Sequence, residues 1–311
     1  MAYNELTEQF QAFFKNINPS STYEKIASSE HRNVIKLLED PKGPSAELTP
    51  KCFLQGSYKQ DTAIHTINDI DIVALCGNLV HPGKGVSRSW SRDEIFDTLA
   101  VALFIDSRYR NKIRYNKKSM CIKVELDINV EILPAVKKAD TFSTDIEPFR
   151  IHDPDTVQWI DAYAREHQKL ITQKNKSTNN LFKPIIKIFK HLRDTFYGSN
   201  ARDAISFHIE CLLYRVPNSL FTSSIPDTIE EVLSCIANFS PSQALNSNIY
   251  NPCGNRLLFS SNEWNITSYG QFNALVTQWS ALARIANSKY SLDEAINFWK
   301  KLLGDNYFPT G

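Results

Sequence analysis

The segment that decides the fold reads QGSYKQDT at residues 55–62 and continues, after six residues, with DIDIV at residues 69–73. In a β-strand alternate side chains lie on the same face, so Asp69 and Asp71 share one face while the isoleucines beside them point into the core. Two neighbouring carboxylates repel each other unless a cation lies between them. Mg²⁺ prefers one or two carboxylates together with substrate phosphates and water, so this strand predicts a magnesium site.

Gly56 and Ser57 follow directly after a strand-like run at residues 52–55. Glycine permits a tight turn into a helix, and such a turn points backbone N–H groups and the serine hydroxyl toward a phosphate. A lone Gly-Ser is most often an ordinary turn, and a lone Asp-x-Asp is most often a solvated strand end or loop. The two motifs together, with Thr62 between them and strand patterns on both sides, favour a site for a phosphate and a metal ion.

The order Gly-Ser, short helix, Asp-x-Asp resembles the polymerase-β-like nucleotidyltransferase superfamily, in which a neighbouring strand supplies a third carboxylate. Here VEILPA at residues 130–135 resembles the acidic-x-x-Pro-Ala strand of oligoadenylate synthases and of the bacterial CD-NTases, the cGAS/DncV-like cyclic-oligonucleotide synthases. The resemblance assigns the third carboxylate to Glu131, where the family usually has Asp. Asp127, in a predicted turn, is the competing candidate, and an exposed strand carboxylate is the alternative interpretation of Glu131.

The stretch KPIIKIFKHLRDTF at residues 183–196 predicts a helix with apolar residues on one stripe and lysines, among them Lys187 and Lys190, on another. Periodicity alone favours a solvated charged face for the lysines. The resemblance to oligoadenylate synthases and CD-NTases implies instead that Lys187 and Lys190 grip the donor triphosphate. Ser206 and Phe207 begin a segment that resembles the family's next helix, which lies beside the nucleotide base. An aromatic residue at such a position is more often part of the core.

The segregation of strand and helix patterns predicts an α+β fold of two lobes, with the active-site cleft between them. By resemblance, residues 1–150 form the nucleotidyltransferase core lobe with a mixed sheet and a long N-terminal helix. Residues 151–304 form an oligoadenylate-synthase-like helical lobe, and residues 305–311 a short mobile tail. Strands are predicted at residues 52–55, 70–75, 121–126 and 130–133, the last ended by Pro134. Helices are predicted from the capping box of Ser91 and Glu94, from the cap Asp153-Pro154, and at residues 184–196, 202–214, 228–237, 269–286 and 291–304.

Composition and charge restrict the class of partner. The 311 residues carry 35 Lys plus Arg against 34 Asp plus Glu, and this net charge of +1 argues against long nucleic acid as the main ligand. The N-terminal stretch lacks the basic region of a signal peptide, and no apolar run reaches the ~20 residues of a membrane span. We therefore expect a soluble, cytoplasmic protein. No His/Cys cluster has zinc-ligand spacing, so the zinc-binding insertion of animal cyclic-GMP-AMP synthase is missing and the resemblance points to the bacterial branch.

The resemblance implies a Mg²⁺-dependent nucleotidyltransferase that binds two metal ions, for which Mn²⁺ can substitute. Such an enzyme makes a cyclic di- or trinucleotide second messenger from ATP and other nucleoside triphosphates, releases pyrophosphate, and acts in antiphage (CBASS) signalling through a separate effector. The implied metal ligands and catalytic residues are Asp69, Asp71 and Glu131, and the implied nucleotide-binding residues are Gly56, Ser57, Lys187, Lys190, Ser206 and Phe207.

Two other functions fit the same residues. A non-cyclising enzyme would add nucleotides to RNA, a protein or a small molecule, although near-neutral charge disfavours long RNA. A catalytically idle nucleotide-binding module is the second, because Glu131 replaces the family's usual Asp. The C-terminal Gly311 resembles the tail that a ubiquitin-activating-like partner conjugates to a target in some CD-NTases, and simple fraying is the alternative interpretation of that tail.

Overall fold

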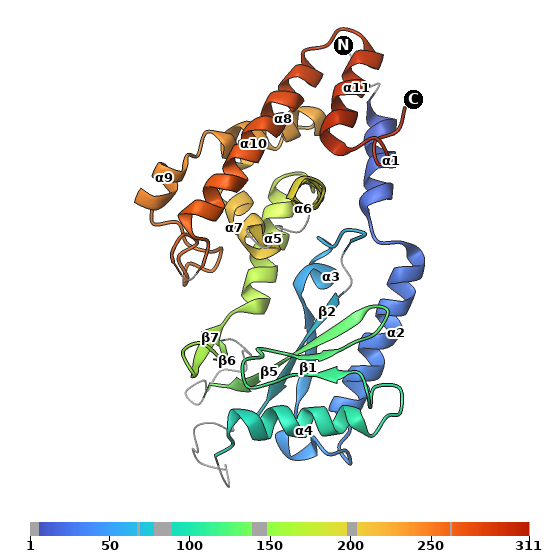
Figure 1. Ribbon diagram of the computed structural model, residues 1–311, viewed down its shortest axis with the longest axis vertical. Coiled ribbons are helices and arrows are strands. Elements are labelled where there is room, and N and C mark those ends of the chain that lie inside the picture. The colour runs from blue at the N-terminus through green and yellow to red at the C-terminus, as the bar shows by residue number, and fades with distance from the viewer. Residues whose placement is uncertain are drawn as a thin grey trace. The chain divides into compact units, whose positions relative to one another are not determined.

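A computed structural model describes residues 6–66, 69–77, 89–138, 148–197, 204–261 and 263–310 (Figure 1). The chain divides into two compact units. The sheet unit comprises residues 19–61 and 66–168, and the helical unit comprises residues 1–18, 62–65 and 169–311. Within the described residues no helix is both long and apolar enough to cross a membrane.

In the residues that the structure describes, the sheet unit is built on one mixed seven-stranded sheet. Five strands follow the order β1-β2-β5-β4-β3, and β6 pairs with β5 and β7. Among these described strands β2 and β5 run parallel, and the other pairs are antiparallel. The strands are β1 (Lys51–Gln55), β2 (Asp69–Cys76), β3 (Ile113–Arg114), β4 (Ile122–Val124), β5 (Asn129–Lys137), β6 (Phe149–Asp153) and β7 (Gln158–Ala162).

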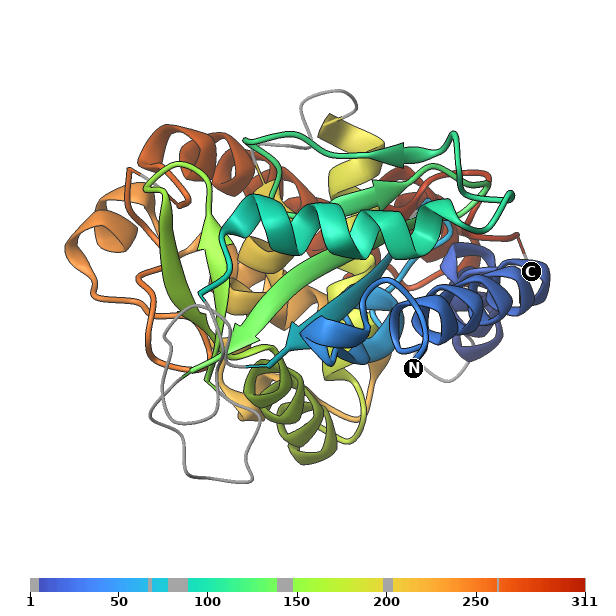
Figure 2. The same cartoon turned by 90° about the horizontal axis from the view of Figure 1, so that it is seen from below.

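Helices α2 (Ser21–Leu38) and α4 (Arg92–Phe104) cover one face of this sheet, and α4, in teal, runs across the strands in Figure 2. The alternation predicted for β2 decides which side chains they cover: Ile70 and Ile72 are fully buried in this core. Asp69 and Asp71, which alternate with these isoleucines, therefore point to the opposite face. The short elements of this unit are the 3-10 helix Ala46–Leu48 and helix α3 (Gly56–Gln60), which directly follows β1.

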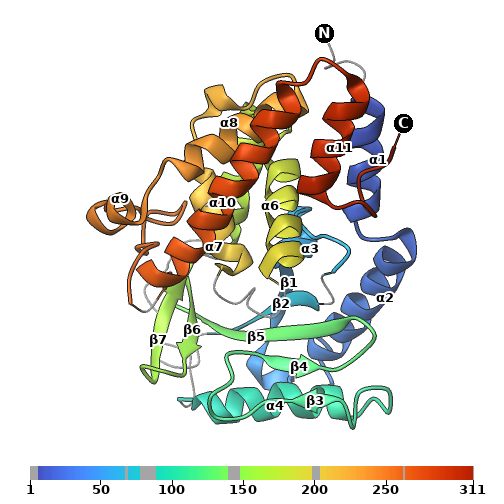
Figure 3. The same cartoon turned by 45° about the horizontal axis from the view of Figure 1, so that its top comes forward.

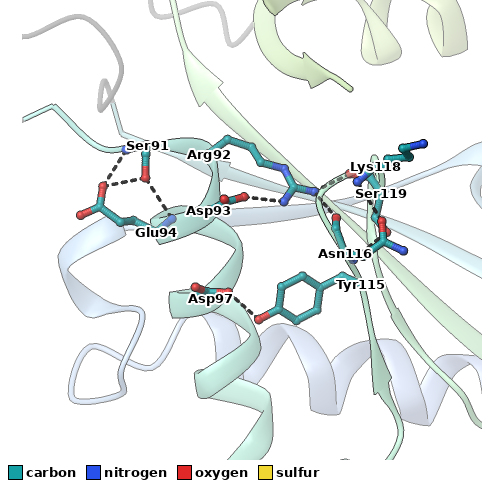
Figure 4. Close-up of polar contacts among 9 residues, drawn as sticks. All are labelled: Ser91, Arg92, Asp93, Glu94, Asp97, Tyr115, Asn116, Lys118 and Ser119. Atoms are coloured by element: carbon teal, nitrogen blue, oxygen red, sulfur yellow. Dashed lines mark hydrogen bonds and ion pairs between the residues drawn. The ribbon is translucent and has the colours of Figure 1, made fainter. Parts of the chain in front are cut away.

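Helix α4 begins at the capping box that the sequence predicts. Ser91 Oγ accepts a hydrogen bond from the Glu94 N–H at 3.2 Å, and the Glu94 carboxylate accepts one from the Ser91 N–H at 2.8 Å (Figure 4). Arg92 donates to the carbonyl oxygens of Asn116 and Ser119, at 2.8 and 2.6 Å. These bonds tie the start of α4 to the loop between β3 and β4.

The helical unit packs around a large apolar core that contains Trp264, Trp279 and Trp299. Helix α10 packs against α8, α9 and α11, and α6 contacts α1, α7 and α11 (Figure 3). The helices are α1 (Thr7–Ile17), α6 (Phe182–Tyr197), α7 (Ser206–Tyr214), α8 (Ile225–Ala237), α9 (Pro241–Asn246), α10 (Ile266–Asn287) and α11 (Leu292–Leu303), with the 3-10 helix Asn218–Leu220. Helix α5 (Ala164–Ser177) crosses from the sheet unit into this one.

Three local predictions differ from the structure. The long N-terminal helix is two helices, because Pro19 cannot continue α1 and Ser20 caps α2 by accepting from the Tyr23 N–H at 3.1 Å. Strand β5 does not end at Pro134 but continues to Lys137. The edge of β5 that faces away from β2 pairs with β4 up to Ile132 and with β6 from Ala135 onward. Pro134 lies between these two partners, where no strand needs its missing N–H group.

Asp153 and Pro154 begin a turn between β6 and β7, not the predicted helix. The Asp153 carboxylate accepts from the Asp155 N–H at 3.0 Å and from Thr156 Oγ1 at 2.7 Å, which closes the turn by the same side-chain chemistry that would cap a helix. Because β6 and β7 extend the sheet, the sheet unit reaches residue 168 and not the predicted boundary at residue 150, while α1 groups with the helical unit.

The C-terminal segment is also not the free tail that we expected. Phe308 is fully buried, with its ring centroid 5.0 Å from that of Phe10 and 6.5 Å from that of Trp299. The Tyr307 carbonyl accepts a hydrogen bond from Asn16 Nδ2 at 2.9 Å. The chain is therefore part of the helical core through Phe308, and Gly311 lies outside the described residues.

Candidate active site

A row of polar residues crosses the sheet on the face opposite α2 and α4. Asp71 of β2 is the register partner of Gln55 on β1 and of Glu131 on β5, and Glu131 is in turn the partner of Lys123 on β4. Because register partners on adjacent strands point to the same side, these side chains lie next to one another. Asp69 lies two residues before Asp71 and shares its face.

The structure therefore brings the three predicted carboxylates of Asp69, Asp71 and Glu131 onto one face of two adjacent parallel strands. All three side chains are half-buried. The competing candidate, Asp127, is exposed and lies in the turn between β4 and β5. The register partner of Asp69 is Asn129, not Asp127, so Asp127 lies outside the paired strands.

The Glu131 carboxylate contacts one side chain on β4 and one that directly precedes this strand. Lys123 Nζ lies 3.7 Å from Glu131 Oε1, and the thiol of Cys121 donates to Glu131 Oε2 at 3.8 Å. Burial, and after it the charge of Glu131, raises the pKa of the Cys121 thiol to about 12, so this thiol stays protonated. Since β4 and β2 flank β5 on opposite sides, these contacts draw Glu131 along the sheet toward β4.

The oxygen-only donor set fits a hard divalent cation such as Mg²⁺. Lys123 already supplies a positive charge beside Glu131, which is the electrostatic environment that a metal ion would provide. The side chains do not stand in final ligand positions, however: across the part of the chain that the structure describes, no three His, Cys, Asp or Glu side chains form a group that could hold a metal ion.

Gly56, the first residue of α3, lies directly against the Asp71 carboxylate. A Cβ atom at this position would lie 1.8 Å from Asp71 Oδ2, and the backbone has a φ of +69°, which side-chain-bearing residues rarely adopt. Two independent constraints therefore require glycine here. Ser57, the next residue, is half-buried in the first turn of α3.

Tyr23 of α2 is close enough to the acidic strand for the charges of Asp69 and Asp71 to act on it, and the sequence analysis does not identify it. Its hydroxyl is buried and has no hydrogen-bond partner among the residues that the structure describes. Burial is the main cause that raises the pKa of Tyr23 to about 12, and the charges of Asp69 and Asp71 add to it. No sequence signal separates this tyrosine from an ordinary core residue.

In the helical unit, Lys187 and Lys190 of α6 are buried, so the interpretation of these two lysines as part of a solvated charged face is wrong. Lys187 is 8% exposed and donates to Asn18 Oδ1 at 3.0 Å. Lys190 is 0% exposed, and its Nζ donates to Glu210 Oε1 at 2.7 Å and to the carbonyl and hydroxyl oxygens of Thr62, both at 3.2 Å. These contacts use the three N–H bonds of an ammonium group.

Ser206 and Phe207 are the first two residues of α7. The Ser206 hydroxyl accepts from the Arg193 guanidinium at 3.2 Å, and the same guanidinium group also donates to Asp194 and to the carbonyl of Ala204. Phe207 is half-buried and packs against the apolar core of the helical unit. This placement agrees with the interpretation of Phe207 as a core residue, and its position beside a nucleotide base stays a prediction.

Two family profiles match the chain. Residues 5–175 match the Second Messenger Oligonucleotide or Dinucleotide Synthetase domain, and residues 169–280 match the cGAS/DncV-like nucleotidyltransferase C-terminal helical domain. These profiles describe a nucleotidyltransferase that synthesises oligonucleotide second messengers and carries a helical domain after its catalytic domain. The chain belongs to the bacterial CD-NTase family.

Characterised relatives are cyclic nucleotide synthases. The chain is 28% identical over 227 residues to the cyclic UMP-AMP synthase of Rhodothermus marinus, a match that covers 67% of this chain and 77% of the relative. It is 25% identical over 317 residues to the cyclic AMP-AMP-AMP synthase of an Acinetobacter species, which covers 97% of this chain and 85% of the relative.

Solved structures share the fold. CdnC of Escherichia coli MS115-1, in complex with HORMA-deltaN, superposes with a TM-score of 0.72 at 15% identity and covers 99% of this chain and 100% of that one. Rhodothermus marinus CdnE, solved with Apcpp and Upnpp, gives 0.68 at 23% identity and covers 88% of this chain and 96% of that one. The predicted α+β fold and the enzyme class, a cyclic oligonucleotide-synthesising nucleotidyltransferase, are confirmed.

Proposed function

We propose that this chain makes a cyclic di- or trinucleotide from ATP, alone or with a second nucleoside triphosphate, and releases pyrophosphate. The observation that carries the proposal is the register of β2 with β5, which aligns Asp71 with Glu131 on the face that also carries Asp69. The contact of the Gly56 backbone with Asp71 supports it, because Ser57 is the next residue in the same helix.

In this proposal Asp69 and Asp71 hold two Mg²⁺ ions, for which Mn²⁺ can substitute, and Glu131 completes the ligand set. When bound, the metal ions lower the pKa of the acceptor ribose hydroxyl and neutralise charge on the phosphates. Glu131 has to leave Lys123 to take this role, and the pair is weak enough for that, because both side chains are partly exposed and their closest atoms are 3.7 Å apart.

The triphosphate is held by Ser57 with the Gly56 backbone and by Lys187. We favour Lys187 over Lys190 because the three N–H bonds of Lys190 are used by Glu210 and Thr62. Ser206 and Phe207 lie beside the base in this proposal. For a cyclic product the linear intermediate turns round in the same site, so acceptor recognition accepts two poses.

We further propose a cytoplasmic role in antiphage (CBASS) signalling, in which the product activates a separate effector. The relatives that the chain matches are cyclic nucleotide synthases, and the net charge of +1 suits small nucleotides better than long nucleic acid. A ubiquitin-activating-like partner that conjugates Gly311 would have to act on the residues after Phe308, because Phe308 is buried in the helical core.

The proposal is tested by incubating the protein with Mg²⁺ and each labelled nucleoside triphosphate, followed by phosphatase. Phosphatase-resistant label that is lost in Asp69→Asn supports cyclisation. Phosphatase-sensitive label indicates a non-cyclising enzyme. Triphosphate binding without turnover indicates an idle binding module, which the contact between Glu131 and Lys123 makes a specific alternative. Mass spectrometry of the resistant product gives the bases and the ring size.

A further inference from the structure

Residues 62–65, which we call the connecting segment, belong to the helical unit, whereas the residues on both sides of it belong to the sheet unit. The segment lies in the chain between the Gly-Ser helix α3 and the acidic strand β2. Four residues separate Ser57 from Thr62, and three separate His65 from Asp69. Whatever holds the connecting segment therefore holds the junction between the two motifs of the candidate active site.

One anchor of the connecting segment is a buried ion pair. Lys190 of α6 and Glu210 of α7 are joined at 2.7 Å, and both contact Thr62. Lys190 Nζ donates to the carbonyl and hydroxyl oxygens of Thr62, and the Thr62 hydroxyl donates to Glu210 at 3.1 Å. The exposed fractions of Thr62, Lys190 and Glu210 are 0%, 0% and 5%. The ion pair thus binds both the backbone and the side chain of one residue.

A second anchor holds the other end of the connecting segment. The His65 N–H donates to the Ile17 carbonyl at 2.8 Å, and a hydrogen bond of 3.1 Å joins His65 Nε2 to the Tyr307 hydroxyl. Between the anchors, Ala63 and Ile64 are buried. All four residues of the segment are therefore fixed to the helical unit.

Burying this ion pair costs free energy, because both charges lose their hydration. Apolar residues of similar volume often give equal or higher stability in the same place. Stability alone therefore does not explain it. An apolar pair would bury the same volume, but it would offer no hydrogen bonds to the carbonyl and hydroxyl of Thr62. What the ion pair adds is a directional attachment of the connecting segment to two helices.

We propose that Lys190 and Glu210 are positioning residues for nucleotidyl transfer, which hold Thr62 on α6 and α7 and thereby fix the junction between the Gly-Ser and Asp-x-Asp motifs. The proposal rests on the proposed function for its catalytic consequence. In it Lys190 acts through Thr62 and does not bind phosphate. Displacements of about 1 Å at a reacting group cost roughly 100-fold in rate, so a loosened junction lowers turnover.

The test uses the full chain with Lys190→Met and Glu210→Met combined, which removes both charges and keeps apolar bulk. We expect kcat to fall about 10- to 100-fold while KM for ATP changes less than about twofold.

Two further variants test whether the effect runs through Thr62. Thr62→Val removes the shared hydroxyl. We expect it to lower kcat less than the double variant does, and to add almost nothing when combined with it, because both act through one anchor. Lys174→Met is the matched control. This buried lysine donates to Val216 and Asn218, both outside the connecting segment, and we expect its substitution to leave kcat unchanged.

Hydrogen exchange gives a readout that does not depend on activity. In the double variant we expect faster exchange of backbone amides in α3 and at the start of β2, and no such change in Lys174→Met. An increase of KM for ATP at constant kcat would make Lys190 a phosphate ligand and overturn the proposal. Amide exchange in α3 and β2 of the double variant at the wild-type rate would also overturn the proposal. A wild-type protein that forms no product refutes the proposed function instead, and the exchange result then decides the positioning role alone.

Discussion

Three carboxylates of the sheet unit and three lysines of the helical unit differ in how deeply their side chains are buried. Asp69, Asp71 and Glu131 are half-buried on the sheet face that the helices α2 and α4 leave uncovered. In the helical unit, Lys174 and Lys187 are each 8% exposed and Lys190 is 0% exposed, and all three donate hydrogen bonds within that unit.

This difference in burial follows from the kind of element that carries each charged residue. On a strand with one face covered by helices, alternation sends every second side chain to the other face, so a carboxylate there points away from the core beneath those helices. On a helix that is surrounded by others, a lysine is desolvated and has to find partners inside the protein. The carboxylates are therefore suited to chemistry, and Lys174 and Lys190 to holding the structure.

The largest expected effect is the loss of a carboxylate. We expect Asp71→Asn to lower the rate of pyrophosphate release about 1000-fold, because a neutral amide no longer stabilises bound metal ions. Asp127→Asn, in the exposed turn, is the control and should stay within about twofold of wild type. Comparable losses in both variants would contradict the assignment of the acidic strand.

Glu131→Gln should lower the same rate about 100-fold. Lys123→Met removes the cation that contacts Glu131 and should lower the Mg²⁺ concentration needed for half-maximal activity by about two- to threefold, since an ion pair this exposed is worth ~0.5 kcal/mol. A Mg²⁺ titration of both variants measures this. A Glu131→Gln enzyme with wild-type activity would remove Glu131 from the ligand set.

Gly56→Ala should lower activity about 10- to 100-fold, because the new methyl group would lie 1.8 Å from the Asp71 carboxylate and displace it. Gly254→Ala is the matched control. Its φ is +73° and no atom lies near the added Cβ, so it loses about 1 kcal/mol of stability without loss of activity. Chemical denaturation together with the activity assay separates backbone strain from displacement of the carboxylate.

The remaining effect is on stability and not on activity, and it concerns Lys174, which lies near the rings of Phe182, Tyr214 and Phe221. Burial lowers its pKa from 10.5 to about 8. Between these values the unfolded chain binds more protons than the folded one, so the free energy of unfolding rises with pH, by at most about 1.4 kcal/mol per pH unit.

Denaturation of wild type and Lys174→Met at pH 7.5 and pH 9.5 tests this, since the other groups titrate in both proteins. We expect the stability of wild type relative to the variant to increase at the higher pH. A constant difference would indicate that Lys174 keeps its ordinary pKa in the folded protein.

Local sequence rules predicted the features that depend on neighbouring residues. Alternation put Asp69 and Asp71 on one face, and the capping box of Ser91 placed the start of α4. The pairing of Asp71 with Glu131 joins strands 60 residues apart, and alternation within one strand carries no information about such a register. The family resemblance supplied that candidate.

The predictions that failed are those in which distant contacts outweigh a local signal. Pro134 reads as a strand end, yet β5 changes partners there and continues. The burial of Lys190 depends on Thr62 and Glu210, which are 128 and 20 residues away in the chain, so helical periodicity could not show it. Phe308 follows Gly304, which ends α11, so the sequence predicts a mobile tail there. In the structure Phe308 packs against Phe10 of α1, near the other end of the sequence.

The interleaving of the two units constrains how the gene could be cut or recombined. The chain passes from one unit to the other four times, at residues 18/19, 61/62, 65/66 and 168/169. A gene split at any single codon therefore gives no pair of self-contained fragments. A break within α5, where the two family matches meet, would leave α1 and residues 62–65 on the fragment that does not contain the rest of their unit. An exchange of helical domains between relatives would have to carry those two short pieces along.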